Sequence, residues 1–288
     1  MNRNQVLSTM AALGAVLFFS TGGLCVKVIE AGPLYISGMR SLVAFLFFFA
    51  VFGLQGKWRE MFRLSPVGWA TAVSYAMVVS MYVIANKLTT AANVIFLQYT
   101  MPAWVLIGGA LFLGERVTFG RVTSIVLCLM GMIFFFQGDM EPGDWSGNVV
   151  ALGAGLSFAV MTLLIRFGRK KTPLHAIMMG NLITALTNLP MALLLVPSDF
   201  YHVPEVGGMI SILWLGIFQI GIAYICYTAA LRGLPAIEVA ILMLLEPILN
   251  PLLVYWEIGE VPSGWAFVGG GIIMISVLIR IIFVREKV

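Results

Sequence analysis

Long apolar runs separated by short polar or turn-forming segments cover almost the whole of this sequence. A run of about 20 apolar residues is long enough to cross the roughly 30 Å hydrocarbon core of a bilayer as an α-helix. The pattern therefore predicts an all-α polytopic membrane protein, with Gly, Pro and Ser marking the turns between the runs. We number the ten predicted transmembrane helices as spans 1 to 10, and they cover residues 6–28, 34–54, 66–86, 91–113, 119–137, 146–166, 173–196, 206–230, 236–257 and 264–284.

Composition agrees with this pattern. Hydrophobic residues make up 60% of the chain and charged residues 10%, with a mean hydropathy of +1.00, whereas a soluble domain has about 25% charged residues. An ordinary soluble domain is therefore excluded, and the net charge of +4 does not indicate a nucleic-acid partner. Cys25, Cys128 and Cys226 stand singly in apolar runs without CxxC spacing, which favours core packing over metal or redox roles. We expect no cofactor and no metal, a surrounding of membrane lipids, and either a monomer or a homodimer.

The distribution of basic residues predicts the orientation. With the N-terminus inside, fourteen of the 17 Lys and Arg residues lie in segments that face the cytoplasm, while only Lys27 and Lys87 face outward and Arg40 lies within span 2. Cytoplasmic loops of membrane proteins carry an excess of Lys and Arg. We therefore predict an integral protein of the cell (inner) membrane with both termini in the cytoplasm.

The two halves of the chain resemble each other. Each half, 1–140 and 141–288, holds five spans, and an odd number means that the halves insert with opposite orientation. Inverted repeats are typical of secondary transporters, with the substrate site at the repeat interface near the bilayer midplane. We predict that Pro102 and Pro247 mark equivalent points beside one cavity. A shift of 145 residues aligns Trp69 with Trp214, Tyr82 with Tyr227, Pro102 with Pro247, and Gly114-Glu115 with Gly259-Glu260.

Span 9 contains groups that a transmembrane helix normally excludes. Glu246 lies near its middle, Pro247 follows directly, and Asn250 and Pro251 come about one turn later. A carboxylate at that depth costs roughly 2.5–3.5 kcal/mol on insertion scales, so it is by default a functional candidate. Proline removes a backbone donor, and such freed backbone is tolerated beside other helices or a wet cavity. Because inverted repeats are typical of transporters, we predict that Glu246 is the principal ionisable group of the transport cycle. The structural alternative is a proline kink whose acid pairs with a distant base.

The polar and aromatic residues of spans 1, 3, 4, 8 and 9 form a candidate substrate cavity. An apolar, aromatic wall with a few polar groups is typical of a small-molecule site. For each aromatic residue ordinary packing is the alternative, and for each amide a hydrogen bond between helices. Besides Glu246 the candidates are Asn250, Gln98, Tyr99, Trp104, Tyr82, Asn86, Gln219, Tyr224, Tyr227 and Thr21.

Four further charged residues have specific expectations. Arg40 is the one basic residue clearly within a span, and it has three possible roles: pairing with Glu246, binding a carboxylate of the cargo, or extending to the interface. A structural or gating role is favoured over direct cargo contact. Glu238 is expected to pair with the nearby Arg232 at the cytoplasmic end of span 9. Glu115 and Glu260 each follow a glycine in a turn that is expected to shape a helix end, because glycine permits a left-handed or a tightly packed exit.

The arrangement resembles a known family. Two sets of five spans, proline-centred spans 4 and 9 that each end in Gly-Glu, and Arg40 early in span 2 are similar to the EamA-like branch of the drug/metabolite transporter superfamily. The resemblance covers essentially the whole chain. It implies a ten-helix fold with a cavity between the repeats, lined by spans 1, 3, 4, 6, 8 and 9. It also implies transport, mostly export, of amino acids, other metabolites or toxic compounds, without defining the cargo.

We therefore predict a secondary active transporter that exports a small organic solute by alternating access, coupled to protons or driven by the solute gradient. A lipid or lysolipid flippase is the alternative. A membrane-embedded enzyme is less favoured, because it needs convergent catalytic groups and the two histidines, His175 and His202, are isolated in the sequence. No GxxxxGK[ST] motif is present, so nucleotide hydrolysis by that route is excluded.

Overall fold

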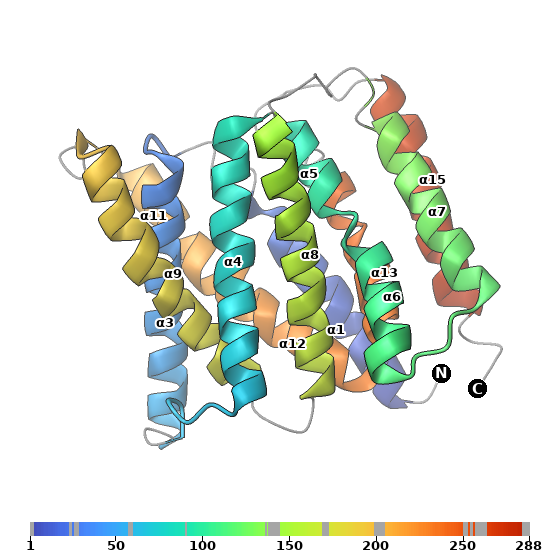
Figure 1. The fold of residues 1–288 in the computed structure, drawn as a ribbon, viewed down its shortest axis with the longest axis horizontal. Helices are drawn as coiled ribbons and strands as arrows, with labels where there is room; N and C mark the ends of the chain where they lie inside the picture. Colours follow the sequence, from blue (N-terminus) through green and yellow to red (C-terminus); the bar gives the residue numbers. More distant parts are fainter. Residues whose placement is uncertain are drawn as a thin grey trace.

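The computed structural model describes residues 3–22, 25, 29–56, 60–89, 91–135, 137, 145–168, 173–198, 205–249, 253, 256 and 264–283. Within these ranges every regular element is a helix (Figure 1). The helices are α1 (Arg3–Ser20), α3 (Pro33–Leu54), α4 (Pro66–Leu88), α5 (Ala91–Gln98), α6 (Met101–Leu113), α7 (Phe119–Phe135), α8 (Trp145–Phe167), α9 (Pro173–Leu195), α11 (Val206–Trp214), the π-helix η1 (Leu215–Ile222), α12 (Ala223–Gly233), α13 (Ala236–Met243) and α15 (Gly264–Phe283).

These helices follow the predicted spans closely, because a transmembrane segment must satisfy its backbone hydrogen bonds internally. Spans 4 and 8 are divided, into α5 and α6 and into α11, η1 and α12. α7 is a shorter apolar helix, and the total of ten spans stays a prediction. Six stretches among the described residues are long and apolar enough to cross a membrane: Pro33–Leu54, Pro66–Ala85, Val94–Leu113, Trp145–Phe167, Pro173–Leu195 and Val206–Gly233.

Local sequence explains where individual helices begin and end. α4 begins after Ser65, whose hydroxyl accepts a hydrogen bond from the backbone N–H of Gly68 at 3.2 Å, and Pro66 fills the first helical position. α6 ends at Gly114, which has a left-handed backbone with φ of 64°. The N–H of Glu115 returns to the carbonyl of Gly109 at 2.9 Å. The expectation that this glycine permits a left-handed exit from the helix is therefore confirmed.

The helices pack in pairs that correspond between the two halves. α3 packs on α9, and α7 packs on α15 at one edge of the bundle (Figure 1). α4 packs on α8 in the same way that α12 packs on α1, and α4 also contacts α9 as η1 contacts α3. If each helix is replaced by its counterpart five spans away in the other half, every pair named above becomes itself or another pair in the same list. The helical contacts are thus consistent with two structurally equivalent halves.

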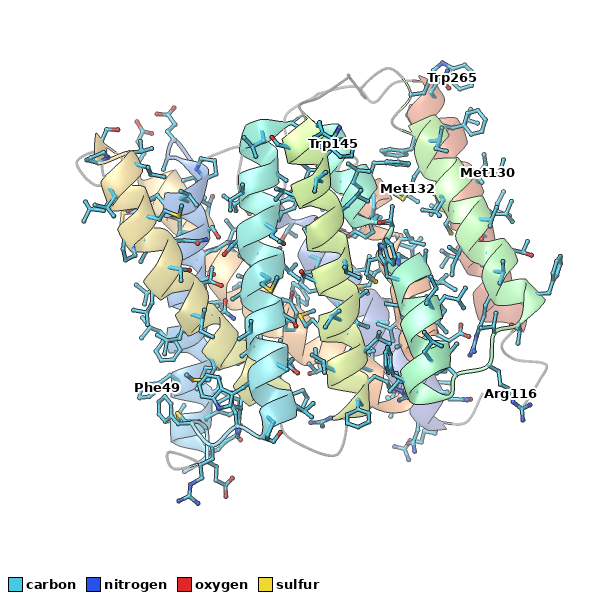
Figure 2. The ribbon with its side chains drawn as sticks, in the orientation of Figure 1. Phe49, Arg116, Met130, Met132, Trp145 and Trp265 are labelled. Carbon is cyan, nitrogen blue, oxygen red and sulfur yellow. The ribbon has the colours of Figure 1, made fainter. Side chains whose placement is uncertain are left out.

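The polar ends of the bundle can be distinguished. Figure 1 marks both ends of the chain at the same end of the bundle. Arg116 lies at that end, whereas Trp145 and Trp265, in the first turns of α8 and α15, lie at the opposite end (Figure 2). An even number of crossings of the bundle is required for this arrangement. We call the end that carries Arg116 the terminal end.

Candidate functional site

Two helices are interrupted at corresponding positions. α5 stops at Gln98 and α6 starts at Met101, while α13 stops at Met243 and helix resumes at residue 246. At each break the backbone changes from i→i−4 to i→i−3 hydrogen bonds. The N–H of Thr100 donates to the carbonyl of Leu97 at 3.3 Å, and the N–H of Leu245 donates to the carbonyl of Leu242 at 3.1 Å. These two bonds are separated by the same 145 residues as the two prolines.

Each proline follows its break directly. Pro102 is the second residue of α6, and Pro247 is the second residue of the turn of helix at 246–249. Proline has no backbone N–H, so its position needs no hydrogen-bond acceptor in the preceding turn. A break directly before a proline therefore leaves fewer backbone groups unsatisfied than a break elsewhere in the helix. Span 9 after residue 249 lies mostly outside the described residues, and so do Asn250 and Glu260.

Glu246 and Tyr99 meet where the two breaks face each other. Glu246 is half-buried, and its carboxyl group is in hydrogen-bonding contact with the hydroxyl of Tyr99. Tyr99 is 6% exposed. The α6 and α13 segments that flank the breaks pack against each other. The structure therefore brings together the predicted ionisable residue of span 9 and one predicted cavity residue of span 4.

An aromatic cluster lies beside this pair. Tyr224 of α12 is its centre, with its ring centroid 5.1 Å from Phe19, 5.1 Å from Tyr75 and 6.0 Å from Tyr227. Phe158 of α8 lies 6.0 Å from Tyr227. Edge-to-face rings at such distances stabilise one another beyond their buried area. We call these five residues the aromatic cluster, and it joins spans 1, 3, 6 and 8.

Arg40 and Glu246, a basic and an acidic residue, both lie near this cluster. Tyr224 lies within electrostatic reach of both residues, and Tyr75 lies within reach of Arg40. The Nε atom of Arg40 is buried and has no hydrogen-bond partner. Among the described residues Arg40 forms no ion pair with Glu246 or with any other acid. Of the three roles considered for Arg40, direct pairing with Glu246 is thus absent from this structure.

Gln219 and Thr21 lie where span 1 meets span 8. Gln219 belongs to the π-helix η1, a helix type that often occurs at functional sites. Its Oε1 atom is buried without a partner, and its Nε2 atom lies 3.1 Å from the position that a Cβ on Gly22 would occupy. Thr21 accepts a hydrogen bond from the indole of Trp214 at 3.1 Å. The hydroxyl of Thr21 is therefore already bonded to span 8, while Gln219 retains hydrogen-bonding capacity.

The other predicted residues have different surroundings. Tyr82 is half-buried and lies within electrostatic reach of Tyr99. Gln98 is the half-buried last residue of α5. Trp104 is 39% exposed, and its indole donates to Thr100 at 3.3 Å. The side chain of Asn86 lies outside the part of the chain whose side chains are described.

The sequence analysis missed Tyr75, Asn181 and Thr162. The hydroxyl of Tyr75 donates to Asn181 Oδ1 at 2.9 Å, and Thr162 shares a hydrogen bond of 2.5 Å with the hydroxyl of Tyr227. All three residues are fully buried. Tyr75 lies two helical turns before Tyr82 on the same face of span 3, and this spacing is a signal that sequence alone contains.

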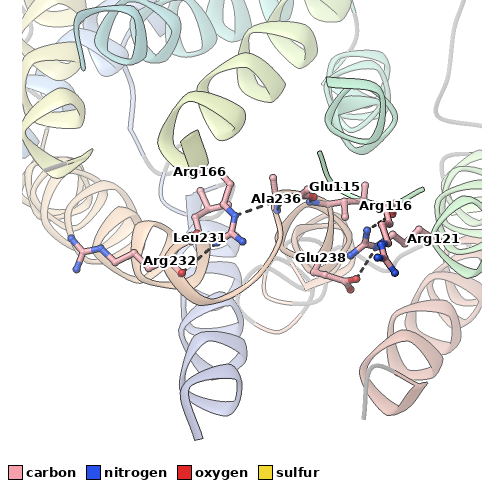
Figure 3. Close-up of polar contacts among 9 residues, drawn as sticks. Glu115, Arg116, Arg121, Arg166, Leu231, Arg232, Ala236 and Glu238 are labelled. Carbon is pink, nitrogen blue, oxygen red and sulfur yellow. Dashed lines mark hydrogen bonds and ion pairs between the residues drawn. The ribbon is translucent and has the colours of Figure 1, made fainter. Parts of the chain in front are cut away.

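A cluster of charged residues lies at the terminal end (Figure 3). Glu238 pairs with Arg121 at 3.1 Å, with the two side chains 9% and 12% exposed. The expected pair between Glu238 and Arg232 is therefore wrong. Glu238 lies in the first turn of α13, which contacts α6 and α7, so the basic residue at the start of α7 is its neighbour. Arg232 is exposed instead.

Glu115 has a role that its turn alone did not indicate. One carboxylate oxygen accepts a hydrogen bond from the backbone N–H of Ala236 at 2.8 Å, and the other accepts one from Ile237 at 3.4 Å. The Nε atom of Arg166 lies 3.7 Å from the same carboxylate. Arg166 also donates to the carbonyls of Leu231 and Arg232 at 2.8 and 3.3 Å. Glu115 thus caps the N-terminus of α13, a helix in the other half of the chain.

No group of three His, Cys, Asp or Glu side chains in the described part of the chain lies close enough to hold a metal ion. The three cysteines are unpaired. The aromatic, hydrogen-bonding and ionic groups that the structure assembles around Glu246 and Tyr224 are typical of a site for an organic molecule.

An all-helical membrane protein in which two broken helices meet at a polar, aromatic centre has the architecture of a transporter. The chain belongs to the EamA-like transporter family, whose sequence profile matches residues 7–137 and 145–282. It is thus a membrane transporter of the drug/metabolite type, and its family implies a small-molecule solute as cargo.

Individual relatives agree with this assignment. An uncharacterised transporter of Archaeoglobus fulgidus is 27% identical over 208 residues, which cover 72% of this chain and 73% of the relative. An uncharacterised transporter of Bacillus subtilis is 30% identical over 161 residues, which cover 54% and 52%. A solved crystal structure shares the fold with a TM-score of 0.86 at 20% identity, covering 97% of this chain and 98% of the other.

Proposed function

We propose that this protein is a secondary active transporter that exports a small organic solute across the cell (inner) membrane by alternating access. The observation that carries the proposal is the contact between Glu246 and Tyr99 at the breaks of spans 9 and 4. Broken transmembrane helices are where secondary transporters place substrate and coupling ions. The half-buried carboxyl group of Glu246 at this point can bind either a proton or the cargo, and this competition couples the movement of the two.

The two halves of the chain act as inverted repeats in this proposal. Support comes from the hydrogen bonds at the two breaks, which repeat after 145 residues, and from the corresponding helix pairs of the two halves. The cavity lies between residues 1–140 and 141–288.

The terminal end faces the cytoplasm. A reporter fused after Val288 should be active only in the cytoplasm, and activity on the outer side would contradict this orientation.

The solute binds against the aromatic cluster, between Arg40 and Glu246. Arg40 is a half-buried cation whose Nε atom is buried without a hydrogen-bond partner and that has no acidic partner among the described residues. A charge within a membrane protein is retained when it serves a function. The sequence favours a structural or gating role for Arg40, but its unpartnered Nε atom supports contact with an anionic group of the solute. Gln219, with its unpartnered carbonyl oxygen, offers a neutral acceptor near the same wall.

Purified protein in liposomes loaded with a pH-sensitive dye tests the proposal. Cationic, anionic, zwitterionic and neutral metabolites are added in turn, and a cargo is identified by proton flux or by uptake of the labelled compound. Glu246→Gln is the matched variant, since it keeps the size and removes the titratable group. Parallel liposomes with fluorescent lipids measure the competing flippase activity. Lipid movement without solute flux would favour the flippase.

A further inference from the structure

The terminal end of the bundle is closed below Glu246. All eight residues of α13 are buried, with exposed fractions from 0% to 7%. In the corresponding helix of the other half, α5, the last four residues, Ile95, Phe96, Leu97 and Gln98, are only half-buried, although Val94 is buried. The two equivalent helices therefore have unequal surroundings. The structure has the terminal side of the Glu246 site shut and the opposite side less tightly packed.

The contacts that hold this end shut cross between the two halves of the chain. Glu115 closes α6, in the first half, and its two carboxylate oxygens accept hydrogen bonds from the first two amides of α13, in the second half. A carboxylate at a helix N-terminus satisfies amides that have no partner within the helix, and it opposes the positive end of the helix dipole. α13 is thus held by an acid from outside its own half.

Arg166 ties the same carboxylate to a third helix. It is the last-turn arginine of α8, and its guanidinium reaches Glu115 at 3.7 Å and the carbonyl of Leu231 at the end of α12 at 2.8 Å. Its side chain is 15% exposed and that of Glu115 is 12% exposed, so the interaction is only partly screened by solvent. Figure 3 shows α8, α12 and α13 converging on this pair.

We propose that Glu115 and Arg166, with the first turn of α13, form a latch that shuts the terminal end of the transport path, and that each transport cycle requires its release. The proposal rests on the alternating access proposed above, because a path that must open toward both sides must lose the contacts that close either one. Both residues are positioning residues: they act on Glu246 through α13, and they need not touch the cargo.

Release of the latch exposes α13, and a thiol placed on that helix reports the exposure. Ala240 is 0% exposed, and Ala240→Cys is a small change in volume. Cys25, Cys128 and Cys226 are first replaced by Ser. The labelling rate of Cys at position 240 by a water-soluble maleimide is then measured in nanodiscs, where both faces of the protein are accessible.

We expect Glu115→Gln and Arg166→Gln each to increase the labelling rate about tenfold, since a charge at a helix terminus contributes up to about the free energy of one decade in an equilibrium constant. Arg116→Gln is the matched control. It removes a charge from the neighbouring residue, whose side chain is exposed, and it keeps the backbone carbonyl of residue 116 that accepts from Arg121. The control should label at the parent rate.

Two results overturn the latch. One is an unchanged labelling rate in both Glu115→Gln and Arg166→Gln, and the other is an equal increase in Arg116→Gln. If Glu115→Gln does not fold, Arg166→Gln decides alone, because it leaves the bonds from Glu115 to α13 in place. The measurement needs no cargo. The liposome experiment tests the proposed transport function, and the labelling experiment tests the latch. Failure of one can therefore be told apart from failure of the other.

Discussion

The hydroxyl of Tyr75 donates a hydrogen bond of 2.9 Å to Asn181 Oδ1, although the two residues are 106 positions apart. The bond joins α4 to α9 and holds the Tyr75 ring against Tyr224 at the centre of the aromatic cluster. The amide of Asn181 is held in turn by its bond to Ile177 at 2.9 Å. A buried polar pair thus sets the position of one wall of the candidate site.

Tyr75→Phe should destabilise the protein slightly without unfolding it. The ring contact with Tyr224 is kept, while Asn181 Oδ1 loses its donor. Hydrogen bonds between transmembrane helices contribute roughly 0.6–2 kcal/mol, so we expect a fall in the thermal unfolding midpoint of a few degrees. The midpoint is measured on purified protein in detergent. Asn181→Leu should cost more, since it also leaves the Tyr75 hydroxyl buried without an acceptor. An equal midpoint for all three proteins would show that the bond contributes nothing.

Glu246→Gln should fold normally and lose proton-driven transport. Gln keeps the volume and a hydrogen-bonding group for Tyr99 but does not exchange protons. We expect both a large loss of flux under a pH gradient and a flat dependence of the remaining flux on pH. Tyr99→Phe is the companion variant, because it removes the contact and leaves the acid in place. It should keep a pH dependence. Wild-type flux and pH dependence in Glu246→Gln would make this acid structural.

Pro247→Ala should slow transport while stabilising span 9. Alanine restores the missing backbone donor and favours a continuous helix over the i→i−3 bonds at Leu245 and Ile248. Pro102→Ala removes the corresponding proline from α6. We expect each single variant to reduce the initial rate of uptake in liposomes and the double variant to reduce it further. Full activity of the double variant would exclude a mechanistic role for the two prolines.

Gly155→Ala should disturb the break in span 4. A Cβ at Gly155 would lie 2.8 Å from the carbonyl oxygen of Gln98 and 3.0 Å from that of Leu97, so the backbone at the break must shift. Overpacking of this kind typically costs about 1–3 kcal/mol. Gly153→Ala is the control on the same helix, because its Cβ meets the flexible end of Met81 at 3.3 Å. Thermal unfolding should separate the two variants, and equal midpoints would contradict the close packing.

The sequence by itself predicted that the chain is helical, the approximate positions of its helices and the two equivalent prolines. A bilayer leaves the backbone no hydrogen-bonding partner, so an apolar run of sufficient length must be helical. Proline cannot donate a backbone hydrogen bond wherever it stands, and Pro102 and Pro247 therefore located the breaks before α6 and before Glu246. The aligned residues of the two halves also indicated that these breaks are equivalent.

Only the tertiary structure decided which side chains meet. In a transmembrane helix the lipid-facing and core-facing residues are both apolar, so the periodicity that separates the two faces of a soluble helix is weak. Tyr99, at 6% exposure, and Trp104, at 39%, were for that reason equal candidates in the sequence. The contact of Tyr99 with Glu246, the pairing of Glu238 with Arg121 and the capping of α13 by Glu115 all join residues from different helices. Such contacts depend on how the helices pack, and packing is determined by the whole bundle and not by the neighbours of a residue in sequence.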